Sequence, residues 1–345
     1  MKKLILIFSV ILLFTILTKA QPVIYVNYVS HNEDSYTYLT NQSIYMTSRA
    51  AIIQFATECY IKGAKWSIGS EYVFLQAIAK YDTGTVTYNT NGKNLLKWLD
   101  QDRDVECDPH SHESKFNYAD VAYLHTELGV TPSSVRSGFI YNSVNNNGDT
   151  WMEYQNPVQG DSFPSYTWHP EILWGAATLG HVNDPEYYGA WKPRDTTDFF
   201  VHESGNHLIN YGNGCKIVAS ELTVVEVLQI IDNLIDAIDN GSVPETGFYC
   251  MSIFFQDSKL RQSAFLLKMG HITDSINLRV GQGKMEWKHI EDVIQTWKTD
   301  YSSEPFHMSC DFQSIYSIPL SNWAIYFGIF LIIGFLVLRN WGRLG

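Results

Sequence analysis

The chain has 345 residues and a formal net charge of −12 at pH 7. This acidic balance argues against nucleic acids and anionic membrane surfaces as partners, because both carry negative charge themselves. Aromatic residues make up 14% of the chain, which suits either sugar stacking or a large hydrophobic core, so a glycan partner stays compatible with the composition.

The first twenty residues have the pattern of a secretory signal peptide. Lys2 and Lys3 precede an apolar run over residues 4–17, and the small residue Ala20 marks the expected cleavage position. The run is short for a membrane span, which needs about 20 apolar residues. We therefore expect residues 1–20 to be removed and the protein to be exported. The alternative is an uncleaved anchor helix.

Predicted strands and helices alternate along the chain that follows. Apolar and β-branched runs predict strands at 23–30, 65–68, 105–113, 137–141, 171–179, 198–201 and 248–255. Helical spacing of apolar residues predicts helices at 43–62, 94–100, 118–128, 222–238 and 290–297, with 72–80 as helix or loop. This alternation indicates a parallel sheet with covered faces, and residues 21–316 have the length of an α/β barrel domain.

Ionisable residues stand where the predicted strands end. They are His31, Glu33, Asp34, Glu71, Asp108, His110, His112, His181, His202, Glu203 and Asp257. In α/β barrels the carboxyl ends of the strands share one face, and functional sites gather there. Single members of this set can be solvated loop residues, but their recurrence at so many strand ends predicts a site.

One of these strand ends has three potential metal ligands within five residues. Asp108, His110 and His112 alternate along the segment 105–113, and alternate residues of a strand face the same side. Two imidazoles and a carboxylate on one face suit a divalent metal such as zinc. The alternative is a polar strand end whose histidines are satisfied structurally.

The C-terminal segment 317–345 has the pattern of a membrane helix. Residues 324–338 are apolar and uncharged, and tryptophans and arginines flank them. The flanking residues are Trp323, Trp341, Arg339 and Arg343. Tryptophans at both interfaces and arginines beyond one of them predict a span whose far end stays in the cytoplasm.

The motif Ile-Pro-Leu-Ser-Asn-Trp at 318–323 directly precedes this helix. Motif, helix and arginines together resemble the C-terminal sorting signals of bacterial exosortase systems. The resemblance implies a bacterial cell-surface protein whose tail is recognised by an exosortase-like transpeptidase. An ordinary tail anchor is the alternative. Without its two ends the chain has a formal charge of about −17.

Five cysteines are scattered at positions 59, 107, 215, 250 and 310, without a Cys-x-x-Cys pair. Export permits a disulfide, but an odd number leaves at least one thiol free. Their spacing does not fix which of them pair.

The first 130 residues resemble the polysaccharide deacetylase family of metal-dependent carbohydrate esterases. The paired acids Glu33-Asp34 end the first strand, Gly63-Ala-Lys-Trp-Ser-Ile-Gly69 is similar to the family's second strand, and Glu106-Cys-Asp-Pro-His110-Ser-His112 is similar to its histidine motif. Glu127-Leu-Gly129 follows, so order and spacing agree over residues 23–130. The resemblance implies an irregular (β/α) barrel of seven or eight strands.

The chain departs from the family pattern in four places. The family's first motif is two aspartates and a glycine, whereas this chain has Glu33, Asp34 and Ser35. Its metal-type histidines are two residues apart, whereas the family spaces them four apart. The later arginine-proline motif is at best matched by Trp191-Lys-Pro193-Arg194, and the last strand ends in Gln256-Asp257 without the family's leucine-histidine motif. These departures describe a divergent member.

The resemblance also implies roles for the strand-end residues. Asp34, His110 and His112 are expected to hold a zinc-type ion, and Glu33 is expected to act as general base; the roles of Glu33 and Asp34 can be exchanged. His202 oriented by Glu203 is the first choice for the acid that protonates the leaving group, with His31 and His181 as alternatives. The remaining residues expected to support the site or contact substrate are His31, Glu71, Asp108, His181 and Asp257.

The expected activity is removal of acyl groups from surface or extracellular carbohydrate, and three alternatives stay open. The first is another metal hydrolase, because the Asp108-to-His112 pattern is similar to that of phosphoesterase and amidohydrolase barrels. The second is a glycoside hydrolase that uses two carboxylates, such as Glu33 and Glu203, without metal. The third is an inactive barrel that serves as a carbohydrate-binding surface adhesin.

Overall fold

The computed structural model describes residues 22–33, 37–112, 115–138, 149–175 and 186–311. The predicted signal peptide, the predicted tail at 317–345, Asp34 and His181 lie outside these ranges. Within them, none of the helices has the length and apolar character that a membrane crossing requires.

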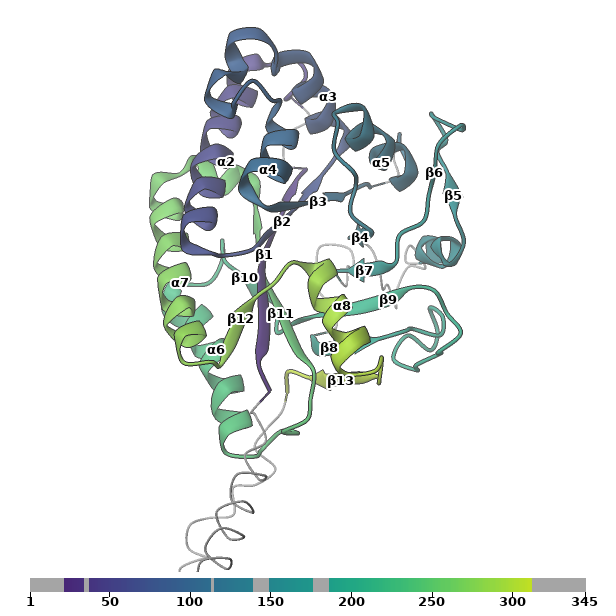
Figure 1. Cartoon of the computed structure of the whole chain (residues 1–345), viewed down its shortest axis with the longest axis vertical. Helices are drawn as coiled ribbons and strands as arrows, with labels where there is room; N and C mark the ends of the chain where they lie inside the picture. Colours follow the sequence, from purple (N-terminus) through teal and green to yellow (C-terminus); the bar gives the residue numbers. More distant parts are fainter. Residues whose placement is uncertain (1–21, 34–36, 113–114, 139–148, 176–185, 312–345) are drawn as a thin grey trace, which may run out of the picture.

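A six-stranded sheet forms the centre of the structure, with β1 inside it (Figure 1). Its strands follow the order β10-β11-β1-β2-β3, β12 also pairs with β1, and every pair is parallel. The strands are β1 (Ile24–Asn32), β2 (Trp66–Ser70), β3 (Val105–Pro109), β10 (Ile217–Val218), β11 (Tyr249–Gln256) and β12 (Met285–Trp287). The predicted parallel sheet is therefore confirmed for this part of the chain.

A second, five-stranded sheet has the order β13-β8-β9-β7-β4. Strands β4 (Val135–Ser137), β7 (Ile172–Trp174) and β9 (Ile209–Gly214) are parallel, whereas β8 (Tyr187–Trp191) is antiparallel to both of its neighbours, β9 and β13 (Phe306–Ser309). An isolated parallel bridge between His110 and Ser137 links the two sheets. The result is a barrel-like mixed α/β fold, but the strands of the described residues do not close into the expected barrel. Strands β5 (Val158–Gln159) and β6 (Thr167–Trp168) form a small antiparallel hairpin that belongs to neither sheet.

Helices cover the outer face of the first sheet, where α2 and α7 lie side by side (Figure 1). The helices are α2 (Gln42–Lys62), α3 (Tyr72–Tyr81), α4 (Leu95–Arg103), α5 (Tyr118–Glu127), α6 (Val224–Asp239), α7 (Ser263–Gly281) and α8 (Ile290–Asp300). Short 3₁₀ turns occur at Gly84–Thr90, Asp149–Gln155 and Asp257–Arg261. Local signals set the helix starts: the Asn41 side chain caps α2, and Thr223 and Glu226 form a capping box on α6.

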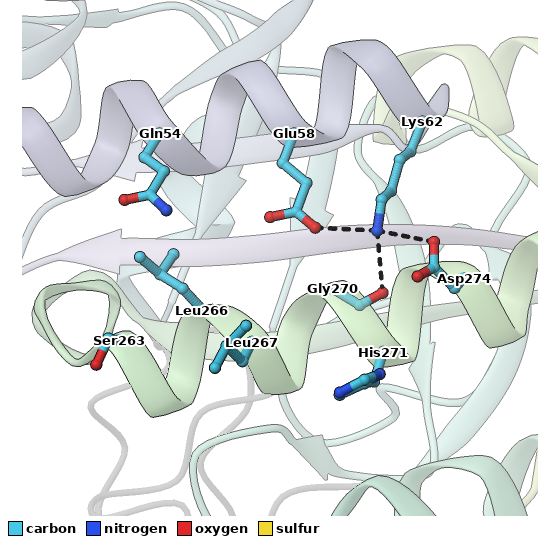
Figure 2. Close-up of a pocket in the computed structure, with 9 residues that line it drawn as sticks. All are labelled: Gln54, Glu58, Lys62, Ser263, Leu266, Leu267, Gly270, His271 and Asp274. Atoms are coloured by element: carbon cyan, nitrogen blue, oxygen red, sulfur yellow. Dashed lines mark hydrogen bonds and ion pairs between the residues drawn. The ribbon is translucent and has the colours of Figure 1, made fainter.

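A surface hollow of about 380 Å³ lies between α2 and α7 (Figure 2). Lys62 occupies its rim, where its Nζ lies 3.0 Å from Glu58 and 2.7 Å from Asp274 and donates to the carbonyl of Gly270. These contacts bind one helix to the other. The hollow therefore marks a helix–helix seam on the outside of the fold and lies away from the strand ends.

Several predictions for the second half of the chain are wrong. Residues 198–201 form a turn, because the Asp195 carboxylate accepts hydrogen bonds from the backbone of Thr197 and Asp198, while Phe199 is buried against the second sheet. Helix α7 and strands β8, β9 and β13 were not predicted. The β-branched strands and periodic helices of the first half lie close to their predicted positions.

A chain of buried polar side chains connects the two sheets through the interior. Asn27 of β1 donates to the Tyr211 hydroxyl of β9 at 3.1 Å and accepts from the Ser252 hydroxyl of β11 at 2.7 Å. The Trp174 indole of β7 donates to the same Ser252 hydroxyl at 2.8 Å. Because buried polar groups are costly when unpaired, these bonds fix how the four strands face one another.

We expect Asn27→Ala to lower the free energy of unfolding by about 2–3 kcal/mol, because it removes the partner of two buried hydroxyls. Urea denaturation of the purified chain followed by circular dichroism measures the change. The control is Asn233→Ala on the exposed side of α6, which is expected to shift stability by less than about 0.5 kcal/mol. Equal effects of the two substitutions would contradict a role for Asn27 as a brace.

Candidate metal centre

The candidate centre begins at the carboxyl end of β1. Tyr25 and Val29 of this strand pack into the core between the two sheets, so the alternate residues His31 and Glu33 continue the same face. His31 is 4% exposed. The strand thus delivers an imidazole and a carboxylate to the mouth of the barrel-like interior.

The imidazoles of His31 and His110 stack with ring centroids 3.8 Å apart. They come from β1 and from the end of β3, and β2 runs between those strands. A Cβ atom at Gly69 of β2 would lie 2.6 Å from the His31 ring and 3.4 Å from the Cβ atom of His110. The rings therefore meet across the intervening strand only because that strand has no side chain there.

Glu33 joins the histidines through a single carboxylate oxygen. Its Oε2 lies 2.7 Å from Nε2 of His110, 2.8 Å from Nε2 of His112 and 3.8 Å from Nδ1 of His31. Burial alone would raise the pKa of Glu33, but hydrogen bonds from His110 and His112 outweigh it and hold this pKa well below its usual range. The hydrogen bond to Glu33 raises the pKa of His112 above its ordinary value.

This donor set fits a divalent metal ion. Within the described residues, His31, Glu33 and His110 form a group whose ligand atoms all lie within 4.8 Å of one another. Imidazole nitrogen and carboxylate oxygen are the ligand types of zinc and related ions. The Ser137 hydroxyl lies 3.2 Å from Nδ1 of His110 and fixes the orientation of that ring, as partners of metal-bound histidines commonly do.

The other residues that were expected to support the site or contact substrate do not share one environment. Asp108 is fully buried and accepts a hydrogen bond from Ser133, and burial raises its pKa well above the usual range. Asp257 opens a 3₁₀ turn and accepts from the Tyr38 hydroxyl. Glu71 is 2% exposed and follows β2 directly. The expected ligand Asp34 and the residue His181 lie outside the described ranges.

His202 and Glu203 do not contact Glu33 in the described part of the chain. They belong to the loop between β8 and β9, where His202 accepts from the backbone of Lys192 and Glu203 lies 4.0 Å from Arg194. Because β8 is antiparallel, its carboxyl end pairs with the start of β9. The loop thus lies at the opposite end of the parallel strands from Ser137.

Aromatic side chains that the sequence reading did not single out form the wall around His31. The ring centroids of Phe254 and Trp174 lie 5.1 and 5.6 Å from that of His31. A second glycine, Gly138, adopts φ +83° beside His110, where a Cβ atom would lie 2.9 Å from the ring. Phe254 and Trp174 face the same interior as His31, and strand alternation along the predicted strands at 171–179 and 248–255 was the signal that could have identified them.

Comparison with known proteins places the fold but not the activity. No protein-family model matches the chain, and no curated protein matches its sequence. A probable polysaccharide deacetylase from Pseudomonas aeruginosa PAO1 superposes with a TM-score of 0.50 at 11% identity, covering 81% of this chain and 92% of that one.

Two further solved structures are similar at a lower level. The Puue allantoinase has a TM-score of 0.48 at 11% identity, covering 80% of this chain and 90% of that chain. The 4-alpha-glucanotransferase from Thermococcus litoralis has a TM-score of 0.48 at 8% identity and covers 79% of this chain, which spans only 40% of the glucanotransferase. At these identities the likeness to the deacetylase is one of fold.

Proposed function

We propose that the chain is an exported, metal-dependent hydrolase that removes acyl groups from extracellular carbohydrate, in the manner of polysaccharide deacetylases. The observation that carries the proposal is the position of Glu33, whose carboxylate oxygen lies within 2.8 Å of both His110 and His112 at the carboxyl end of parallel strands. The fold likeness to a deacetylase supports it. The metal-binding type of donor set separates this proposal from a metal-free glycosidase.

In this proposal His110 and His112 hold the metal together with one carboxylate of the Glu33-Asp34 pair, and His31 lies beside them. A bound zinc-type ion would acidify a water molecule and polarise the acyl oxygen. The lowered pKa of Glu33 keeps its carboxylate ionised at neutral pH, which is the form that can bind a metal ion or accept a proton from water. The rings of Trp174 and Phe254 pack against His31 on one side of the centre.

The position of His202 changes the choice of proton donor. The loop that carries His202 and Glu203 lies at the far end of the strands, whereas Nδ1 of His31 is 3.8 Å from Glu33. We therefore favour His31 over His202 as the group that returns a proton to the leaving hydroxyl or amine. The same separation disfavours a two-carboxylate glycosidase built on Glu33 and Glu203.

We expect the purified chain to contain about one zinc-type ion per molecule and to lose most of it in His110→Ala, because that change removes one imidazole ligand. Elemental analysis by mass spectrometry after extensive dialysis measures the stoichiometry. His169→Ala provides the control, since His169 stacks on His207 away from Glu33. A folded wild-type chain without metal would refute the metal centre and leave the adhesin alternative.

With metal bound, the chain is expected to release acetate from acetylated glycans, and His110→Ala is expected to reduce the rate at least about 100-fold, the typical scale for loss of a metal-supported step. Acetate is measured by a coupled enzymatic assay, and phosphate release from a sugar phosphate ester and reducing-sugar release from the glycan are measured in parallel. Release of phosphate or reducing sugar in place of acetate would favour the phosphoesterase or the glycosidase alternative.

The disulfide between Cys215 and Cys310 supports export. It joins the end of β9 to the segment after β13, with the Cα atoms 5.4 Å apart, and such bonds persist in oxidising compartments. Together with the signal-peptide pattern at 1–20, it favours a cell-surface or extracellular location. The exosortase-like transpeptidase and the membrane helix at 317–345 remain part of the proposal on their sequence patterns alone.

Alkylation counts the free thiols directly. Cys59, Cys107 and Cys250 are unpaired and buried, so the denatured, unreduced chain is expected to take up three alkyl groups, and five after reduction. Intact-mass spectrometry gives both numbers. Uptake of five groups without a reductant, in protein prepared from the cell surface, would show that the disulfide does not form.

A further inference from the structure

Glu71 lies level with the candidate metal centre, directly after β2, the strand that runs between those that carry His31 and His110. Backbone register pairs Gly69 with His31 on one side and with Asp108 on the other. Two residues further along, Glu71 is therefore level with Glu33 and His110 and on the same face. Because Gly69 has no side chain, Glu71 is the first side chain of this strand above the stacked imidazoles.

The Glu71 carboxyl is buried without the partners that such a group usually has. It stands at the N-cap position of α3, yet its side chain makes no capping hydrogen bond, although capping is the usual reason for a polar residue there. The residue is 2% exposed, and its Oε1 has no hydrogen-bond partner among the described residues. Its electrostatic neighbours are His112 and Glu33.

Two buried carboxylates elsewhere, Asp82 and Asp120, are satisfied by the fold, whereas one oxygen of Asp108 also has no hydrogen bond among the described residues. Asp82 accepts from Arg49 and from the backbone of Leu95. Asp120 accepts from the backbone amides of residues 161–163. An unpaired buried polar atom costs about 1–3 kcal/mol, so a structural role explains these two acids but not Glu71.

We propose that Glu71 is a substrate-binding residue whose buried carboxyl oxygen accepts a hydrogen bond from a hydroxyl or N–H group next to the scissile acyl bond. The inference rests on the proposed function and narrows its substrate to sugars that carry a free donor beside the acyl group. Burial raises the pKa of Glu71 to about 7, with His112 opposing and Glu33 adding to the shift. Either protonation state leaves an acceptor oxygen.

The test combines a protein change with a substrate change. One substrate is a mono-acetylated sugar with a free hydroxyl on the carbon next to the ester, and the other is its deoxy analogue without that hydroxyl. We expect the zinc-loaded wild-type chain to prefer the hydroxyl substrate by on the order of 100-fold in kcat/KM, since a site built for a donor rejects the analogue that lacks it. In Glu71→Leu the preference is expected to fall below about 5-fold.

Three controls keep the result specific. Glu71→Gln retains an acceptor oxygen and is expected to keep most of the preference, which also covers a folding failure of the leucine variant. Glu245→Leu, at an exposed position, is expected to behave as wild type. Glu245→Leu is also expected to hydrolyse 4-nitrophenyl acetate, which has no neighbouring donor, at the wild-type rate, and all variants are expected to keep wild-type zinc content.

A binding measurement gives a second readout. Isothermal titration with a non-hydrolysable ether analogue of the hydroxyl substrate is expected to show binding to wild type that is weakened on the order of 100-fold in Glu71→Leu. An unchanged preference and unchanged binding in Glu71→Leu would overturn the inference, and so would loss of zinc, which would make Glu71 a metal ligand.

A failure of the proposed function can be distinguished from a failure of the inference about Glu71. If the zinc-loaded wild-type chain hydrolyses neither the sugar esters nor 4-nitrophenyl acetate, the hydrolase assignment falls. If hydrolysis requires zinc and His110 but ignores Glu71, only the inference about Glu71 falls.

Discussion

The contact of two imidazole rings across an intervening strand is the constraint on which the candidate site depends. His31 and His110 stack over Gly69, and any larger residue there would push the rings apart. The stacked rings hold His110 where the Glu33 carboxylate can contact both His110 and His112. One position without a side chain therefore decides whether three strands present one cluster of donors or three separate polar ends.

Beneath this contact, the interior is held by hydrogen bonds as well as by apolar packing. The bonds from Asn27 to Tyr211 and Ser252, and from Trp174 to Ser252, connect strands of both sheets. Within the described residues, one isolated bridge between His110 and Ser137 joins the edges of the two sheets. The sheets therefore lack the continuous hydrogen-bond ladder of a closed barrel. The interior bonds supply part of the registration that a ladder would otherwise give.

Local signals predicted the first half of the chain and the chemistry of the centre, but not the geometry of the second half. The strand ends at Glu33 and His110 follow from alternation and from the ends of apolar runs, and the structure brings them together. The roles given to Asp34 and His181 stay predictions. Sequence periodicity carries no information on strand direction, so the antiparallel course of β8, which takes His202 to the far end, was not predictable. The role of Gly69 between the two imidazoles was also not predictable, because it depends on residues more than 35 positions away along the chain in either direction.

The disulfide at Cys310 has a mechanical consequence for a chain held at its C-terminus, as proposed. Without the disulfide, tension on the tail would act first on β13, which lies at the edge of the second sheet and, among the described strands, pairs with β8 alone. A strand pulled from its end loses its ladder one bond at a time. Because Cys310 follows β13 and is bonded to Cys215 at the end of β9, the load passes to the interior of the second sheet before it can unzip the edge. In a domain tethered by its C-terminus, the disulfide between Cys215 and Cys310 would thus protect β13 from being pulled off the sheet.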